Sequence, residues 1–293
     1  MEDTICYRNF KNVVIKGPPP YQRSVVEQLD KVWATWTGWA VLRGVIDSGK
    51  TVTFVPYSAE DEKKMGRKNA LAAATSLRAA TPYGYWLNSG RADDPDTAKD
   101  ERFETTPFLR GRGGGSDSEV HFSVDTWQTQ PTCSKTVTSA CLPSIYAQNM
   151  GPDDILLHEL VHSLREMHGQ LTLYPTRTKG YDNEDEFFAI LVQNIYASEK
   201  GITILRRDHH GGSAIQRALS TSEGFLGKGQ RPLSMEQLEN RLLVRKLTNE
   251  CFALCSNIRT HVRAPFNPIS EYLCKPALYP YDPKLAWGAP ART

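Results

Sequence analysis

The segment from Asp153 to Gly169 constrains the fold of this chain more than any other feature of its sequence. Its apolar residues recur at helical spacing, with acidic residues in the first turn and a glycine after the last one, which are typical helix boundary signals. The apolar residues are Ile155, Leu156, Leu157, Leu160, Val161 and Leu164. Because they surround the polar residues of the segment, we expect a helix buried on most of its circumference. Such a helix needs other layers of structure around it.

Two histidines lie in the middle of this predicted helix, in the sequence His158-Glu-Leu-Val-His162. A spacing of four residues puts both imidazoles on one face, one turn apart, where a single Zn²⁺ ion can bind both. Glu159 points about 100° away from His158, where its carboxylate can serve as a base without being a ligand. The alternative is a helix with two exposed histidines, but buried imidazoles need partners. We therefore expect Zn²⁺ to be held by His158 and His162.

A catalytic zinc ion also needs a third protein ligand and an open coordination position. The candidates downstream are His168, the pair His209-His210, Glu184 and Glu186. His168 would require the chain to turn back after the second histidine, and Arg165 stands where a glycine would make that turn. The pair His209-His210 lies in a charged, glycine-rich segment that is typical of an exposed turn. The two glutamates are therefore the better candidates.

Glu184 and Glu186 open a second predicted helix, which starts near Asn183 and continues to Gly201. About 200° separates residues two apart on a helix, so only one of the two can face the metal. Glu184 shares a face with aromatic residues that should pack into the core, whereas Glu186 shares a face with Ala189, which is small enough for two helices to approach closely. Both could instead be acidic residues favoured at a helix N-terminus. The helix faces favour Glu186 as the third ligand.

The whole pattern predicts one α+β domain with a small mixed sheet and a helix-rich C-terminal half. We expect helices over residues 21–33, 39–46 and 234–252, strands over 50–57 and 119–124, a helix or a strand with a turn in the alanine-rich stretch 68–80, loop over 88–112, and extended chain after Pro265. No repeat or linker divides residues 1–293. We therefore expect a zinc core at about residues 119–200 that continues into an extension over residues 213–293.

Charge and hydropathy exclude some partners. Thirty-five lysines and arginines against 33 acidic residues leave a net charge of +2, which provides no bulk field toward nucleic acid or anionic lipid. No run of 18 apolar residues is present, and the first ten residues lack the basic stretch and apolar block of a secretory signal. We expect no nucleic-acid partner and no membrane span.

Six cysteines are too few for a disulfide scaffold, and none has the paired spacing of a zinc ribbon. Reduced thiols are therefore expected. Cys251 and Cys255 are four residues apart in an apolar run, so we expect two buried thiols on one face of a helix. Cys133 and Cys141 bracket a loop rich in serine and threonine and could pair in an oxidising setting.

The two predicted zinc segments, His158-Glu-Leu-Val-His162 and Asn183-Glu-Asp-Glu186-Phe-Phe-Ala189, resemble the zinc core of anthrax lethal factor. Over residues 12–200 the chain is similar to the NleD-like effector metalloproteases of pathogenic bacteria, for example in Gly115-Ser-Asp-Ser-Glu-Val-His-Phe122. The resemblance implies a gluzincin-type protease with a zincin-like fold and Glu186 as the third zinc ligand. It also implies a secreted effector that is delivered into the cytosol of a host cell, where it cleaves a protein substrate such as a mitogen-activated protein kinase.

A proton donor for the oxyanion of the tetrahedral intermediate is the weakest part of the resemblance. Lethal factor has a tyrosine seven residues before its ligand glutamate, but Lys179 occupies that position here. Tyr181 and Tyr174 lie nearby, and we expect Tyr181 to donate, although a half-buried structural tyrosine is the alternative.

The sequence thus predicts a zinc-dependent endopeptidase in which Glu159 takes a proton from water and later returns it to the leaving amine. An amidase that acts on a non-peptide or cell-wall amide is an alternative, and so is a non-catalytic protein that binds its target and keeps a zinc ion. Glu159 argues against the non-catalytic protein, since a structural zinc site has no use for this carboxylate. We expect the strand at 119–124 to be the sheet edge to which an extended substrate adds.

Overall fold

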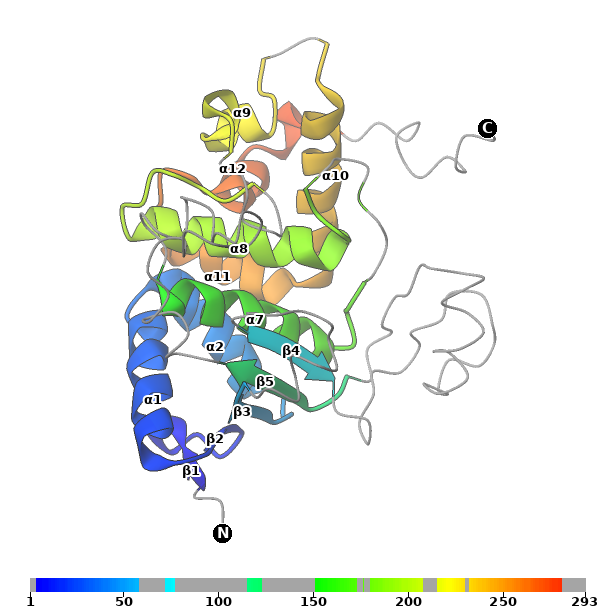
Figure 1. The fold of residues 1–293 in the computed structure, drawn as a ribbon. Helices are drawn as coiled ribbons and strands as arrows, with labels where there is room; N and C mark the ends of the chain where they lie inside the picture. The colour runs from blue at the N-terminus through cyan, green and yellow to red at the C-terminus, as the bar shows by residue number, and fades with distance from the viewer. Residues whose placement is uncertain are drawn as a thin grey trace, which may run out of the picture.

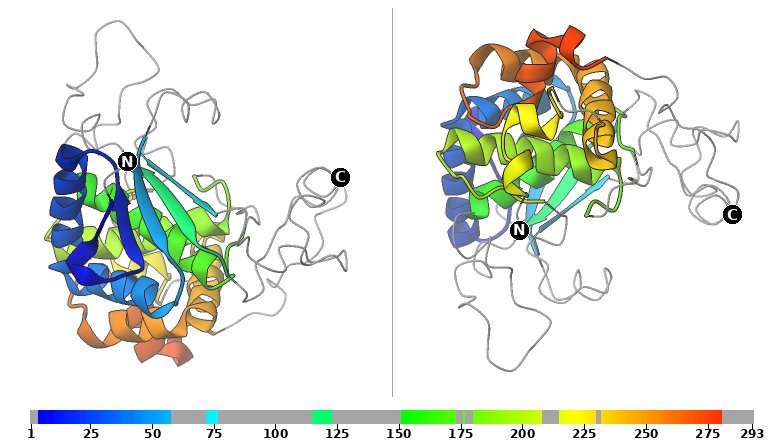
Figure 2. Two further views of the ribbon diagram at one scale, coloured as in Figure 1. Left: turned by 90° about the horizontal axis from the view of Figure 1, so that it is seen from below. Right: turned by 90° about the horizontal axis from the view of Figure 1, so that it is seen from above.

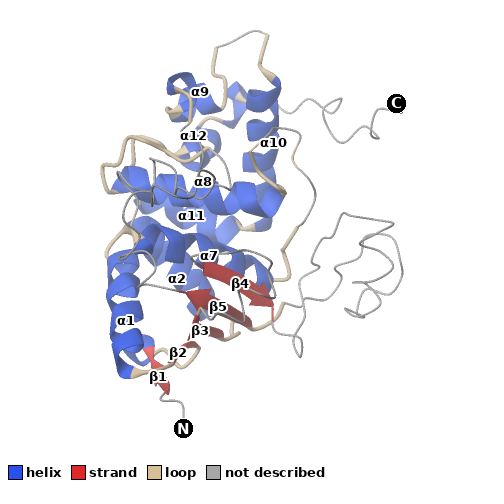
Figure 3. Cartoon of the chain, in the orientation of Figure 1, coloured by secondary structure: helices blue, strands red, loops and turns tan. Residues whose placement is uncertain are grey.

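The computed structural model describes residues 4–57, 72–76, 115–122, 151–172, 176, 180–207, 215–229 and 232–280, with residues 72–76 described by their backbone. These residues form a mixed five-stranded sheet and a set of helices stacked on one side of it (Figure 1). The separation of strands and helices into layers is clearest when the chain is coloured by secondary structure (Figure 3).

The strands are β1 (Thr4–Cys6), β2 (Val13–Lys16), β3 (Val52–Pro56), β4 (Ala72–Ser76) and β5 (Ser118–Phe122), and their order in the sheet is β1-β2-β3-β5-β4. The central strands β2, β3 and β5 are parallel, and the two outer strands are antiparallel to their neighbours. Alternate residues of the central strands are aligned and buried, for example Ile15, Phe54 and Val120. The sheet therefore buries one face with a period of two residues.

The helices are α1 (Pro19–Trp33), α2 (Trp36–Asp47), α7 (Pro152–Met167), α8 (Glu184–Glu199), α9 (Ser222–Phe225), α10 (Met235–Glu250), α11 (Phe252–His261) and α12 (Pro268–Cys274), with short 3-10 turns at Tyr7–Asn9, Arg217–Leu219 and Pro276–Leu278. Helix α7 packs on β4 and β5 and also contacts α1, α2 and α8. The two views of Figure 2 show α8 and the C-terminal helices on the side of α7 away from the sheet. Helix α7 is thus enclosed between two layers, as its apolar residues require.

The end of α8 is fastened to the start of α2. The two carboxylate oxygens of Glu199 accept hydrogen bonds from the backbone N–H groups of Trp36 (2.8 Å) and Thr37 (2.9 Å), and the Thr37 hydroxyl adds a third at 2.7 Å. An acidic side chain at a helix N-terminus satisfies N–H groups that the helix leaves unpaired. This contact fixes the direction of α8 relative to the layer of helices next to the sheet.

The end of α7 is fastened to the start of β5. The Ser118 hydroxyl lies 2.7 Å from Glu166 Oε2 and 2.9 Å from Ser163 Oγ, and the Ser116 N–H donates to the Glu166 carbonyl at 3.2 Å. Gly115 has a φ of +66°, and a Cβ atom there would lie 1.7 Å from the Met167 carbonyl oxygen. The segment Gly115–Ser118 therefore joins strand and helix closely, which explains its small residues.

Much of this arrangement agrees with the expectations from sequence. The mixed sheet, the helix-rich C-terminal half and the elements α1, α2, α7, α8, β3 and β5 are confirmed to within a few residues. In the part of the chain that the structure describes, no helix combines the length and the apolarity needed to cross a bilayer.

Three expectations are wrong. Strand β5 is internal, between β3 and β4, because the alanine-rich stretch supplies β4 as a further strand outside it. The expected helix from Ser234 to Phe252 ends at Glu250, and Cys251 separates α10 from α11 with φ −112° and ψ 51°. Cys251 and Cys255 are both buried, as expected, but Cys251 is the N-cap of α11 and does not lie inside a helix. The chain after Pro265 contains α12 and is not only extended. Strands β1 and β2 were not expected, because they have only three and four residues.

Replacing Gly115 by Ala should destabilise the protein by more than about 2 kcal/mol, because backbone strain is added to a clash with backbone atoms that cannot move independently. The matched control is Gly49→Ala, where φ is +70° but nothing lies within 4 Å of the added Cβ atom. This control should cost only about 1 kcal/mol. Urea unfolding of both variants measures the difference, and equal midpoints would contradict the close approach of residue 115 to α7.

Candidate metal centre

Helix α7 carries two histidines toward α8. All residues from 153 to 167 are buried except His162, and His158 is 3% exposed. The surrounding leucines pack into the core, so the only direction left for the imidazoles is the space between the two helices. The spacing of four residues brings the rings together, with centroids 4.8 Å apart.

Helix α8 begins with a cap that frees one carboxylate to face α7. The side chain of Asn183 accepts a hydrogen bond from the backbone N–H of Glu186 at 3.0 Å. In many helices the residue at this third position turns its side chain back to the cap. Here the carboxylate of Glu186 points across to the histidines instead. From residue 184 to residue 198 it is the only partly exposed residue.

Three ligand atoms converge between the helices. Glu186 Oε2 lies 3.2 Å from His158 Nε2 and 3.5 Å from His162 Nε2, and the two Nε2 atoms are 3.1 Å apart. A tetrahedral zinc ion with bonds of about 2.1 Å holds its ligand atoms about 3.4 Å from one another. The sides of this triangle are within a few tenths of an ångström of that value. His158, His162 and Glu186 therefore fit one zinc ion, and the predicted ligand set is brought together.

Asp185 orients the second histidine from its other side. Its Oδ2 atom lies 2.5 Å from His162 Nδ1, while its Oδ1 atom accepts a hydrogen bond from Arg165 Nε. A metal-binding histidine commonly donates its second ring N–H to a carboxylate, which fixes the tautomer and the direction of the ring. Asp185 has this relation to His162, and its side chain is 2% exposed.

The acidic and basic groups shift one another's pKa values strongly. Burial alone would lower the pKa of His162, but the charge of Glu186 and the hydrogen bond to Asp185 outweigh it and raise this pKa well above its usual value. Burial would raise the pKa of Glu186, but His162 outweighs burial and the pKa falls well below its usual value. Burial lowers the pKa of His158 to about 3. Without a cation between them, the pair His162 and Glu186 thus favours a proton on His162.

The other candidates from the sequence do not join this cluster. Glu184 is buried on another face of α8, where its carboxylate pairs with Lys246 and accepts a hydrogen bond from the Thr172 hydroxyl at 3.1 Å. His168 is exposed at the end of α7. The pair His209-His210 lies outside the described residues. The expectation that Glu186 and not Glu184 faces the histidines agrees with these positions.

The two expected catalytic residues lie on the same elements. Glu159 follows His158 on α7 and is 8% exposed. Tyr181 is 9% exposed, its ring forms a T-shaped pair with that of Phe187 with centroids 5.0 Å apart, and its carbonyl accepts a hydrogen bond from the Thr176 hydroxyl. These contacts give Tyr181 a packing role, and donation to an oxyanion stays a prediction. Lys179, Tyr174, Cys133 and Cys141 lie outside the described residues.

Sequence reasoning missed Asp185 and Arg165. Arg165 was considered only as the residue that replaces a turning glycine, and Asp185 was not considered. A signal was present, because Arg165 lies on a helix that is expected to be buried on most of its circumference, and a buried guanidinium needs an acidic partner. The acidic residues at the start of the next helix were the available partners.

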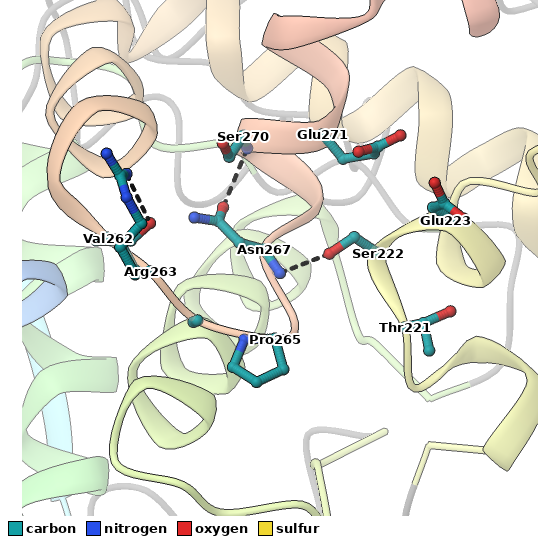
Figure 4. A pocket seen from close by; sticks show the side chains of 10 residues that line it. Thr221, Ser222, Glu223, Val262, Arg263, Pro265, Asn267, Ser270 and Glu271 are labelled. Atoms are coloured by element: carbon teal, nitrogen blue, oxygen red, sulfur yellow. Dashed lines mark hydrogen bonds between the residues drawn. The ribbon is translucent and has the colours of Figure 1, made fainter.

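A pocket of about 400 Å³ lies away from the metal cluster, between α9, the connection from α11 to α12, and α12 itself (Figure 4). Asn267 connects two of its walls. Its backbone N–H donates to Ser222 Oγ at 2.6 Å, and its side-chain Oδ1 accepts a hydrogen bond from the Ser270 backbone N–H at 3.0 Å. None of its lining residues belongs to the metal cluster. The metal-binding residues and this pocket are therefore separate features of the molecule.

Comparison with known proteins finds no matching family model, no matching curated protein and no matching solved structure. A functional assignment therefore depends on the geometry of the residues themselves.

Replacing Asp185 by Asn should weaken zinc binding by roughly 10- to 100-fold, because the amide cannot hold His162 as a carboxylate does. Competition with a chromogenic chelator measures the dissociation constant. His168→Gln is the matched control, since it changes an exposed histidine of the same helix, and it should leave the constant unchanged. An Asp185→Asn variant that binds zinc as tightly as the wild type would show that this carboxylate does not orient a ligand.

Zinc uptake should release about one proton at neutral pH, because His162 is protonated without the metal and must be neutral to bind it. The raised pKa also means that charged His162 stabilises the metal-free protein fully below its unfolded pKa of about 6.5, and that this stabilisation is lost as pH rises through the folded pKa. Zinc affinity should increase over the same range. Calorimetric titrations in buffers of different ionisation enthalpy count the proton, and a count of zero would contradict the charge assigned to His162.

Proposed function

We propose that this protein is a zinc-dependent endopeptidase. The observation that carries the proposal is the triangle of His158, His162 and Glu186, whose ligand atoms have the separations of a tetrahedral zinc site. Two histidines and one glutamate are the ligand set of several zinc peptidases, and a three-ligand site leaves a position for water. A structural zinc site has four protein ligands, whereas the described residues bring three together here, so this donor set favours catalysis.

The chain's own residues supply the rest of the chemistry. When bound, the zinc ion would act as a Lewis acid that polarises a carbonyl group and lowers the pKa of water toward 7. Glu159 is one residue from His158 on a buried helix, where its carboxylate can accept a proton from water and then donate it to the leaving amine. Asp185 keeps His162 in the orientation that binding requires. Tyr181 is the proposed donor to the oxyanion, with the packing contacts described above.

The sheet offers a place for an extended substrate. Among the residues that the structure describes, β4 is an edge strand of the sheet, antiparallel to β5, and it packs against α7, the helix that carries both histidines. An extended peptide can add to such an edge through main-chain hydrogen bonds. His162 and Glu186 are the partly exposed residues of the two buried helical runs, so the proposed site is reached from their side. This arrangement supports a zincin-like fold with the substrate strand beside β4.

The resemblance to NleD-like effectors supports the finer part of the proposal, a secreted effector that cleaves a host signalling protein such as a mitogen-activated protein kinase in the host cytosol. An amidase for cell-wall links and a non-catalytic zinc protein are the alternatives that the experiment below separates.

Replacing Glu159 by Ala should keep one zinc ion per chain and lower cleavage by at least roughly 10²- to 10⁴-fold, because a general base typically contributes this much. The protein is incubated with host-cell lysate and with peptidoglycan, with and without a chelator, and new termini are identified by mass spectrometry. His158→Ala should lose both zinc and cleavage. A Glu159→Ala variant within about tenfold of the wild type would mean that another group is the base, and new ends only in peptidoglycan would favour the amidase.

A further inference from the structure

The guanidinium of Arg165 links the metal centre to the C-terminal helices. It is completely buried, and its Nε atom donates to Asp185, the partner of His162. Its Nη2 atom donates to the Gln170 carbonyl at 2.5 Å, and its Nη1 atom lies 3.4 Å from the Cys251 sulfur. All three nitrogens of the fork therefore have partners, on three different segments of the chain.

The joint between α10 and α11 supplies two of the groups around this guanidinium. Glu250 is the last residue of α10, and its Oε2 atom lies 3.3 Å from Arg165 Nη2. Cys251 stands between the helices, and its thiol lies 3.0 Å from Gln170 Oε1. The amide of Gln170 in turn donates to the Glu250 carbonyl at 2.5 Å. The residues between α10 and α11 thus contact Gln170, which follows α7.

Charge and shape explain why the guanidinium needs this support. Burying a cation is costly unless it is paired, and Arg165 lies between the carboxylates of Asp185 and Glu250. The ring of Phe188 covers its face at 4.4 Å. The planar fork binds in only one orientation, so fixing its Nη atoms also fixes the direction in which Nε meets Asp185.

We propose that the joint of α10 and α11 is a positioning element of the metal centre, which acts on His162 through Arg165 and Asp185. The inference rests on the proposed function only in taking zinc as the ligand of the cluster. Glu250 and Cys251 contact the Nη atoms of the Arg165 guanidinium. The Nε atom of the same guanidinium donates to Asp185 Oδ1, and Asp185 Oδ2 lies against His162 Nδ1. Residues some 65 positions beyond Glu186 thereby affect how tightly the metal binds.

The test measures zinc dissociation constants by chelator competition for Glu250→Gln, Cys251→Ala and Arg165→Lys. The first two should weaken binding by roughly threefold to tenfold each, less than loss of the direct partner Asp185, and their combination should be non-additive because they hold one group. Absorption spectra of the Co²⁺ forms should also change, since they report ligand geometry. Gln closely matches the shape of Glu250, so this variant remains decisive even if Arg165→Lys does not fold.

The matched control is the double variant Glu184→Gln with Lys246→Met. It removes another ion pair, between the buried Glu184 of α8 and the partly exposed Lys246 of α10, and leaves Asp185, Arg165, Glu250 and Cys251 in place. It should change stability and leave the zinc constant and the Co²⁺ spectrum unchanged.

Unchanged zinc constants and spectra in Glu250→Gln and Cys251→Ala would overturn the positioning role and leave the proposed zinc site intact. An equal loss of affinity in the control would also overturn it, because the effect would then follow general packing of α10. A wild-type protein that binds no zinc would overturn the site itself. The expected changes in a protein without peptidase activity would support the positioning role and contradict the endopeptidase.

Discussion

The arrangement of the site depends on the contact of the Asp185 carboxylate with both His162 and Arg165. One of its oxygens contacts His162 and the other contacts Arg165, so the two helices α7 and α8 are joined by a charged contact in which Asp185 and Arg165 are buried. Removing one member would leave a buried charge without its partner, which typically costs several kcal/mol. The neighbouring carboxylate, Glu186, points at the Nε2 atoms of both histidines.

The pattern of burial along α7 and α8 distinguishes the proposed ligands from the other residues of the two helices. Residues 153–167 of α7 and residues 184–198 of α8 are buried with one exception in each run, His162 in α7 and Glu186 in α8. These two residues belong to the same cluster. Within these two helical runs, the partial exposure to solvent is therefore concentrated at two of the proposed ligands.

Sequence patterns predicted the helices of the site well, because α7 and α8 are long and have strong boundary signals. The choice of Glu186 over Glu184 followed from the faces of one helix and agrees with the geometry. Sequence patterns did not predict features that depend on contacts between residues far apart in the chain. Strand β4 has an alanine-rich sequence with no clear period, and only its pairing with β5 makes it an edge. Likewise, Arg165 could be expected to need an acid, but its contacts with Glu250 and Cys251 join residues some 85 positions apart, and no local pattern encodes them.

The order of the elements along the chain makes the contacts of the site more local in sequence than the pairing of the sheet strands. His158, His162 and Glu186 lie on consecutive helices, so the contacts that assemble them close only a short loop. The parallel pairing of β3 with β5 places Val52 beside Ser118 and must close a far longer loop of the chain. Because loop closure costs more entropy as the loop lengthens and non-local pairing slows folding, we expect the α7–α8 pair to form early and the sheet register to form late. Until then the sheet-facing side of α7 would be uncovered, and the nascent protein would present the apolar residues of this helix to chaperones.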